Sequence, residues 1–209
     1  MKKTFVLTVL FILPLVVYMF FASGVTNFGR LPILTENVGE LDAFSGEERL
    51  EGKISILGFL GTDLASKKGN AFNLNQKIYK PFYEFKDFQV VMVVPQGQQQ
   101  AVSELTKELA SFTDTGNWRF VYGEPDQIKE LFASLKTDLF LDETLATPYV
   151  FIIDKERKLR GRQEDDDEGT KFGFNTTSVA DLNNKMKDDV KIILAEYRLA
   201  LKKNQAERN

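Results

Sequence analysis

The 209-residue sequence contains no cysteine. This absence excludes disulfides, thiol catalysis, thiolate-bound iron–sulfur clusters and lipidation at a cysteine. Histidine, the commonest transition-metal ligand and general base, is absent too. The remaining soft donors are four methionines, of which Met92 and Met186 occupy predicted core positions. We therefore expect no transition-metal site, no bound cofactor and no catalytic residues.

An excess of basic charge is also missing. The chain carries 27 Lys and Arg against 30 Asp and Glu, a net charge of −3. A general nucleic-acid surface is therefore not expected. The 43% hydrophobic content, with 18 phenylalanines, is enough for the core of one domain with an appendage.

That appendage is an uncharged apolar run at residues 4–23, preceded by Lys2 and Lys3. About 20 residues are needed to cross a bilayer core, and transmembrane helices tolerate a proline such as Pro14. The alternative is a cleaved signal peptide, which has a shorter apolar region and ends in small residues. The sequence FFA at 20–22 places a bulky ring there, so the pattern favours a retained anchor in the lipid bilayer.

The position of the lysines predicts the orientation of this anchor. Basic flanks resist translocation, so residues 1–3 are expected in the cytoplasm and the rest of the chain outside it. In a Gram-negative bacterium this corresponds to a single pass through the inner membrane with a periplasmic domain. We expect a tether at 24–40, one domain at 41–203 and a frayed tail at 204–209.

The domain alternates strand and helix patterns. Buried or short strands are predicted at 53–60, 88–94, 118–122, 147–154 and 158–162. Apolar residues at helical spacing predict helices at 70–85, shortened by Pro81, at 102–112, from Pro125 to 135, and from 179 to 201. The order β-α-β-α-β-α-β-β-α predicts an α/β, thioredoxin-like fold, with parallel strands first and an antiparallel edge last.

At this point the chain resembles a known family. The anchor, the LP-containing tether, GFLG, VVMVVPQG, TPYVFIIDKERKLRGR and the long last helix are similar to Sco-type proteins. These are membrane-anchored, thioredoxin-fold relatives of the copper chaperones that help to assemble cytochrome c oxidase. The resemblance implies that Thr147-Pro148 occupies the cis-proline position, which makes a cis bond before Pro148 a hypothesis.

The resemblance stops at the chemistry. The family pattern has C-x-x-x-C after the first strand and a later histidine that completes a copper site. This chain has Thr62-Asp63-Leu64-Ala65-Ser66 in that region and no histidine anywhere. Copper ligation and thiol–disulfide exchange are therefore not carried over.

The loop after the first strand is the leading candidate site. Thr62, Asp63, Ser66 and Lys67 follow a strand end, where open α/β sheets usually bind ligands, and helix N–H groups there can hold an anion. The alternative is a solvated loop in which Thr, Asp or Ser caps the next helix. The acidic run at 164–168 has a similar pair of interpretations. It is either a solvated loop or, through Asp165, Asp166 and Asp167, a docking patch for a basic partner.

These features predict a membrane-anchored, catalytically silent domain that binds a protein during assembly of a respiratory or other envelope complex. One alternative is an oxidoreductase-like enzyme that depends on a bound cofactor or a partner's thiols. Another is a ligand-binding sensor at the strand-end loop.

Overall fold

The computed structural model describes residues 2–22 and 29–206. Its strands are β1 (Ile33–Thr35), β2 (Ile54–Leu60), β3 (Phe88–Pro95), β4 (Trp118–Gly123), β5 (Ala146–Ile153), β6 (Leu159–Arg160), β7 (Arg162–Asp165), β8 (Gly169–Lys171) and β9 (Phe174–Asn175). Its helices are α1 (Lys2–Ala22), α2 (Leu64–Leu74), α3 (Lys80–Phe82), α4 (Gln99–Ala110), α5 (Pro125–Ser134), α6 (Val179–Asp181) and α7 (Lys187–Ala206). Two π-helical segments, η1 (Asn75–Tyr79) and η2 (Leu182–Met186), join α2 to α3 and α6 to α7.

The main sheet is mixed and has the order β1-β6-β5-β2-β3-β4, with β9 added beside β5. Strands β2, β3 and β4 run parallel, whereas β5 runs antiparallel to β2, β6 and β9. This is the predicted arrangement, in which the early crossovers give parallel pairs and the late strands an antiparallel edge.

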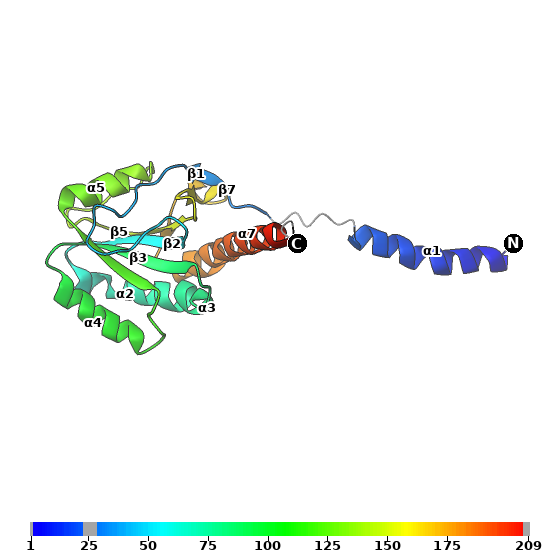
Figure 1. The fold of residues 1–209 in the computed structure, drawn as a ribbon, viewed down its shortest axis with the longest axis horizontal. Coiled ribbons are helices and arrows are strands. Elements are labelled where there is room, and N and C mark those ends of the chain that lie inside the picture. The colour runs from blue at the N-terminus through cyan, green and yellow to red at the C-terminus, as the bar shows by residue number, and fades with distance from the viewer. Residues whose placement is uncertain (1, 23–28, 207–209) are drawn as a thin grey trace.

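Helices cover both faces of this sheet (Figure 1). Because side chains alternate along a strand, β2 sends Ile54 and Ile56 to one face and Leu57 and Phe59 to the other. The first face packs against α2, α4 and the α6–α7 helix, and the second against α5 and the segment at 38–50. All seven residues of β2 are buried, as expected for a strand between two helical layers.

Three segments differ from the sequence-based expectations. Residues 33–35, expected in the tether, form β1 and pair antiparallel with β6 at the sheet edge. The single strand predicted at 158–162 is divided into β6 and β7 around Gly161. The acidic run, expected to be a loop, forms part of the β7–β8 hairpin. Strands β1, β6, β7 and β8 have two to four residues each, which is too short for an alternating pattern to set their bounds.

The helix predicted at 70–85 begins earlier, at Leu64, and ends at Phe82, so the helical stretch containing Pro81 stops short of its predicted end. A proline inside a helix removes one N–H donor and clashes with the carbonyl four residues before it. Here the chain passes through η1 just before Pro81, and the helix ends one residue after it, at Phe82. A π turn widens the helix and loosens the ladder that the proline interrupts.

Helix α1 extends away from the sheet-containing body (Figure 1). Its described side chains at 9–13 and 15–19 are all apolar and exposed. Over the residues whose side chains are described, no helix is both long and apolar enough to cross a membrane.

A buried ion cluster joins the sheet edge to α7. The Arg160 side chain is 4% exposed and donates to Asp154 Oδ2 at 2.9 Å and to Glu196 Oε2 at 2.7 Å. It also donates to the Leu31 carbonyl at 2.9 Å. Asp154 Oδ1 accepts two backbone N–H groups of the turn that follows β5. The cluster therefore ties the segment before β1, the β5–β6 turn and α7 to one guanidinium.

Removing Asp154 leaves the buried Arg160 guanidinium with Glu196 as its remaining carboxylate partner and one side of the guanidinium unsatisfied. We expect Asp154→Ala to lower the free energy of unfolding by about 3–5 kcal/mol, measured by urea titration of the full chain. Asp166→Ala, at an exposed aspartate, is the control and should change it by less than about 0.5 kcal/mol. Equal, small effects of both variants would show that the cluster does not hold the sheet edge.

Candidate functional site

The candidate site lies where the end of β2 meets the beginning of β5. Leu60 pairs with Ala146, and the Thr62 N–H donates to the Thr144 carbonyl at 3.0 Å. Between them Gly61 has a φ of +67°, and a Cβ on it would come within 2.5 Å of the Thr144 carbonyl oxygen. Only glycine fits this close approach of two backbones. The segment at 61–67, which includes the first turn of α2, and the segment at 142–147, which includes the start of β5, are therefore held side by side.

Three of the four predicted loop residues meet at the start of α2. The Asp63 side chain accepts from the Ser66 N–H at 3.3 Å, and Ser66 Oγ donates to the Asp63 carbonyl at 3.0 Å. This is an N-cap, so the capping interpretation of Asp63 and Ser66 is correct locally. Thr62, Asp63 and Ser66 are nevertheless exposed, so the cap presents polar groups to solvent.

The fourth predicted residue, Lys67, contacts the facing loop. Its Nζ lies 3.7 Å from Asp142 Oδ2. Asp142 Oδ1 accepts from the Thr144 N–H at 2.9 Å, from Thr144 Oγ1 at 2.5 Å and from the Ala146 N–H at 3.0 Å. Burial opposes ionisation of Asp142, but these hydrogen bonds and the Lys67 charge outweigh it and lower the pKa of the carboxyl.

The same loop holds an unusual backbone conformation. Leu145, a bulky residue, has a φ of +64°, in the left-handed region that glycine normally occupies. Such a conformation costs of order 1–3 kcal/mol and persists where surrounding contacts hold it. Here the Leu145 N–H bonds to the Asp142 carbonyl, and the Asp142 N–H bonds to the Ala146 carbonyl. These two backbone hydrogen bonds fix the conformation of the loop around Leu145.

This loop also carries an outward-facing aromatic side chain. Phe140 is 80% exposed, the highest fraction among the large hydrophobic side chains that the structure describes. Its neighbours Leu139 and Leu141 pack against the core on the α5 side of the sheet. Two flanking leucines anchored in the core leave Phe140 pointing into solvent.

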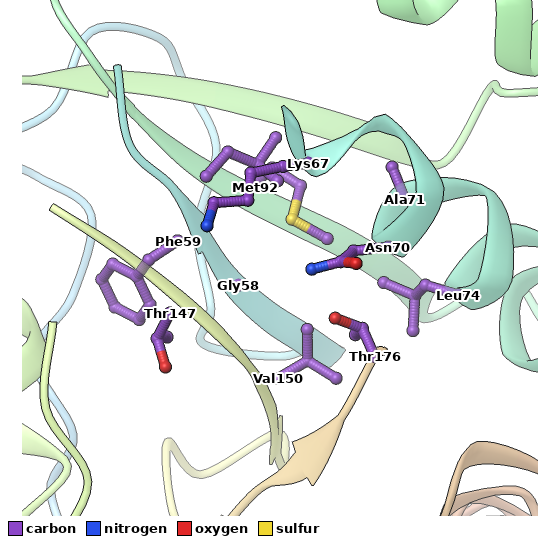
Figure 2. A pocket seen from close by; sticks show the side chains of 11 residues that line it. Gly58, Phe59, Lys67, Asn70, Ala71, Leu74, Met92, Thr147, Val150 and Thr176 are labelled. Carbon is purple, nitrogen blue, oxygen red and sulfur yellow. The ribbon is translucent and has the colours of Figure 1, made fainter. Parts of the chain in front are cut away.

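A small cavity lies beneath this strand end (Figure 2). Its volume is about 10 Å³, and α2 contributes Lys67 and Asn70 on one side while β5 contributes Thr147 and Val150 on the other. A cavity of that size holds about one water molecule, whereas small-molecule sites typically measure about 300–1,000 Å³. The interior of the site is thus closed to a metabolite.

The prediction of a cis bond before Pro148 is wrong. No cis peptide bond occurs within the described residues, which include Thr147 and Pro148. Pro148 lies inside β5, where Ala146 and Val150 on either side of it both pair with β2. Its carbonyl accepts from the Thr176 N–H and Oγ1 at 2.9 and 2.6 Å. An extended strand paired on both sides of the proline favours the ordinary trans isomer.

The acidic run does not form one docking patch. The Asp165 side chain is 1% exposed and accepts from Lys185 Nζ at 2.6 Å, so it is unavailable to a partner. Burial opposes ionisation, but the Lys185 hydrogen bond and the Asp167 N–H lower the pKa of Asp165. Asp166 and Asp167 are exposed, and Asp167 also pairs with Lys185 at 2.6 Å. Lys185 thus joins this hairpin to η2.

Within residues 2–22 and 29–206, no cluster of three acidic side chains is placed to hold a metal ion.

Comparison with known proteins identifies the fold. Neither a family model nor a curated protein matches the sequence. Among solved structures, a proposed protein disulfide isomerase from Bacteroides thetaiotaomicron aligns with a TM-score of 0.52 and 12% identity, covering 79% of this chain and 94% of that one. BsSco, a member of the Sco family of cytochrome c oxidase assembly proteins, aligns with a TM-score of 0.51 and 13% identity, covering 78% and 97%. The thioredoxin-like α/β fold is therefore confirmed, and it is of the kind seen in Sco proteins.

Sequence reasoning missed the second half of the site. Asp142, Leu145 and Phe140 lie about 80 residues after Thr62 and were not recognised. One local signal was present, because Asp142 with Thr144 two residues later is typical of an Asx turn. The exposure of Phe140 had no such signal, since it depends on how its neighbours pack.

We expect the Asp142 carboxylate to protect the backbone amides of the loop at 142–146 from exchange with solvent. We expect Asp142→Ala to raise the hydrogen-exchange rate of the Thr144 and Ala146 amides at least about tenfold at neutral pH, because their acceptor is removed. The exposed neighbour variant Glu143→Ala should leave these rates unchanged. Because the pKa of Asp142 is lowered, its contribution is complete above the unfolded value near 4 and is lost as the pH falls through the folded value. Exchange that is unaffected by Asp142→Ala would contradict this role.

Proposed function

We propose that this chain is a single-pass protein of the bacterial inner membrane whose thioredoxin-like domain acts by binding another protein. The binding surface is the docking face, formed by Thr62, Asp63, Ser66 and Lys67 together with Phe140. The domain performs no chemistry of its own and serves in the assembly of a respiratory or other envelope complex.

One observation carries this proposal: the docking face is rigid and closed. The Lys67–Asp142 contact and the hydrogen bonds of Asp142 hold the two loops together above a cavity of about 10 Å³. A preformed surface with an exposed aromatic side chain is the arrangement that protein interfaces use, because little ordering entropy is lost on binding. Phe140 is the side chain best placed to enter a partner's pocket.

The membrane anchor is supported by the character of α1. A helix that is apolar all round is stable against lipid but not against water, and the described side chains of α1 at 9–13 and 15–19 are exposed and apolar. The uncharged run at 4–23 has the length of a bilayer core, and Lys2 and Lys3 favour a cytoplasmic N-terminus. The docking face then lies in the periplasm.

The role in assembly is supported by the resemblance to Sco-type proteins and by the likeness of the fold to BsSco. At this degree of identity the likeness concerns the fold alone, so the assembly role depends on the anchor and the docking face together. A protein with a Sco-type scaffold and no copper or thiol ligand keeps the means to dock but not to transfer metal or electrons.

Two alternatives are less well supported. A ligand-binding sensor needs a pocket at the strand end, and the cavity there admits about one water molecule. An oxidoreductase that uses a bound cofactor or a partner's thiols lacks any side chain of its own to carry electrons, since the sequence has no cysteine.

The docking face is tested by capture of partners from native membranes. We expect Phe140→Ala in the tagged full chain to reduce recovery of its specific partner at least about tenfold, as for a central aromatic contact, measured by quantitative mass spectrometry. Phe112→Ala is the matched control, because Phe112 is also exposed, at 57%, but lies after α4. A partner whose capture is lost equally in both variants, or in neither, would place the binding surface elsewhere.

A further inference from the structure

A second feature lies at the opposite end of β2 from the docking face. A groove of about 240 Å³ opens between the end of α3, the start of β3 and the second half of α7. Its floor is apolar and consists of Ile54, Phe88 and Leu194, all nearly fully buried. Phe85, which is 40% exposed, and Tyr197 form its apolar sides.

The rim of this groove is cationic. Lys86, Lys155 and Arg198 line it, and Asp87 is the one carboxylate among the lining residues, so the net charge is +2. Lys155 bonds to Asp87 at 2.5 Å and lies 5.6 Å from the centre of the Tyr197 ring. The Lys155 hydrogen bond lowers the pKa of Asp87, which therefore stays ionised.

The Lys86 and Arg198 side chains are accessible to a ligand. Lys86 and Arg198 are exposed, and within the described part of the chain neither forms an ion pair. An apolar floor beneath unpaired cations suits a ligand that joins a hydrocarbon segment to a negative group.

The position of the groove indicates where such a ligand comes from. Tyr197 also lines a neighbouring hollow whose other wall includes Gly29 and Arg30, the first described residues after α1. Seven chain steps separate Ala22, the end of α1, from Gly29, so the fully extended chain spans at most about 25 Å. If α1 lies in a bilayer, this face of the domain is held close to the lipid headgroups.

We propose that the groove binds an anionic lipid of the membrane that holds α1. Lys86 and Arg198 contact the phosphate, and the upper part of an acyl chain lies on the floor formed by Ile54, Phe88 and Leu194. This inference rests on the anchor in the proposed function but not on the docking face. Because β2 spans about 20 Å, lipid contact at its first residue directs the docking face away from the membrane.

The test uses the full chain in phosphatidylcholine nanodiscs that contain a small fraction of a photoreactive lipid. The lipid carries a diazirine in the upper part of one acyl chain and is either phosphatidylglycerol or phosphatidylcholine. Labelled peptides are located by mass spectrometry. We expect both lipids to label α1, whereas peptides containing Phe85–Phe88 and Leu194–Arg198 are labelled at least about tenfold more by the anionic lipid.

Variants separate lipid binding from general attraction to the surface. The double variant Lys86→Gln, Arg198→Gln should reduce groove labelling about tenfold and leave α1 labelling unchanged. The charge-matched control is the double variant Lys107→Gln, Lys129→Gln, on the exposed surfaces of α4 and α5. It should change neither the labelling of the groove nor the labelling of α1.

Each remaining outcome decides between the two proposals. Equal groove labelling by both lipids, or no groove labelling, would overturn the lipid site. Groove labelling without α1 labelling would refute the anchor and, with it, the proposal that the lipid comes from the membrane that holds α1. Labelling of α1 alone would preserve the anchor and refute the lipid site.

Discussion

The placement of β2 between a parallel and an antiparallel neighbour is the constraint on which the rest of the structure depends. Its pairing with β3 places α2 directly after its end, and its pairing with β5 returns the chain to that same end at Ala146. Gly61 permits the two backbones to touch. The order of the strands therefore brings together the segments that form the docking face. The proposed lipid groove lies at the other end of β2, where Ile54 is the first residue of the strand.

This geometry is consistent with the proposal that the strand end serves recognition. In place of reactive side chains, the strand end carries an N-cap from Asp63, an ion pair between Lys67 and Asp142, and a loop that projects Phe140. These contacts fix the shape of the surface and fill its interior. Rigidity then favours binding, because the loops are already ordered when a partner arrives.

The sequence predicted the elements whose periodicity is local and strong. The buried strands at 54–60 and 88–95 and the long helix after Ser178 could be predicted because burial on one or both faces leaves a regular apolar pattern. Strand β1 could not, because it forms only by pairing with β6, far along the chain. The β7–β8 hairpin could not, because its strands of four and three residues are too short for a recognisable alternation. The candidate site divides in the same way. Asp63 and Ser66 could be predicted from a capping pattern, whereas Phe140 joins the site only through the tertiary packing of its neighbours.

The central claim is that the docking face recognises a protein, and photocrosslinking in native membranes tests it most directly. A photoreactive phenylalanine analogue replaces Phe140 in one full-length protein and Phe112 in another. The account predicts one predominant protein adduct from position 140, absent from position 112 and lost when Asp142→Ala loosens the loop. The same set of adducts from both positions, or none from position 140, would contradict it.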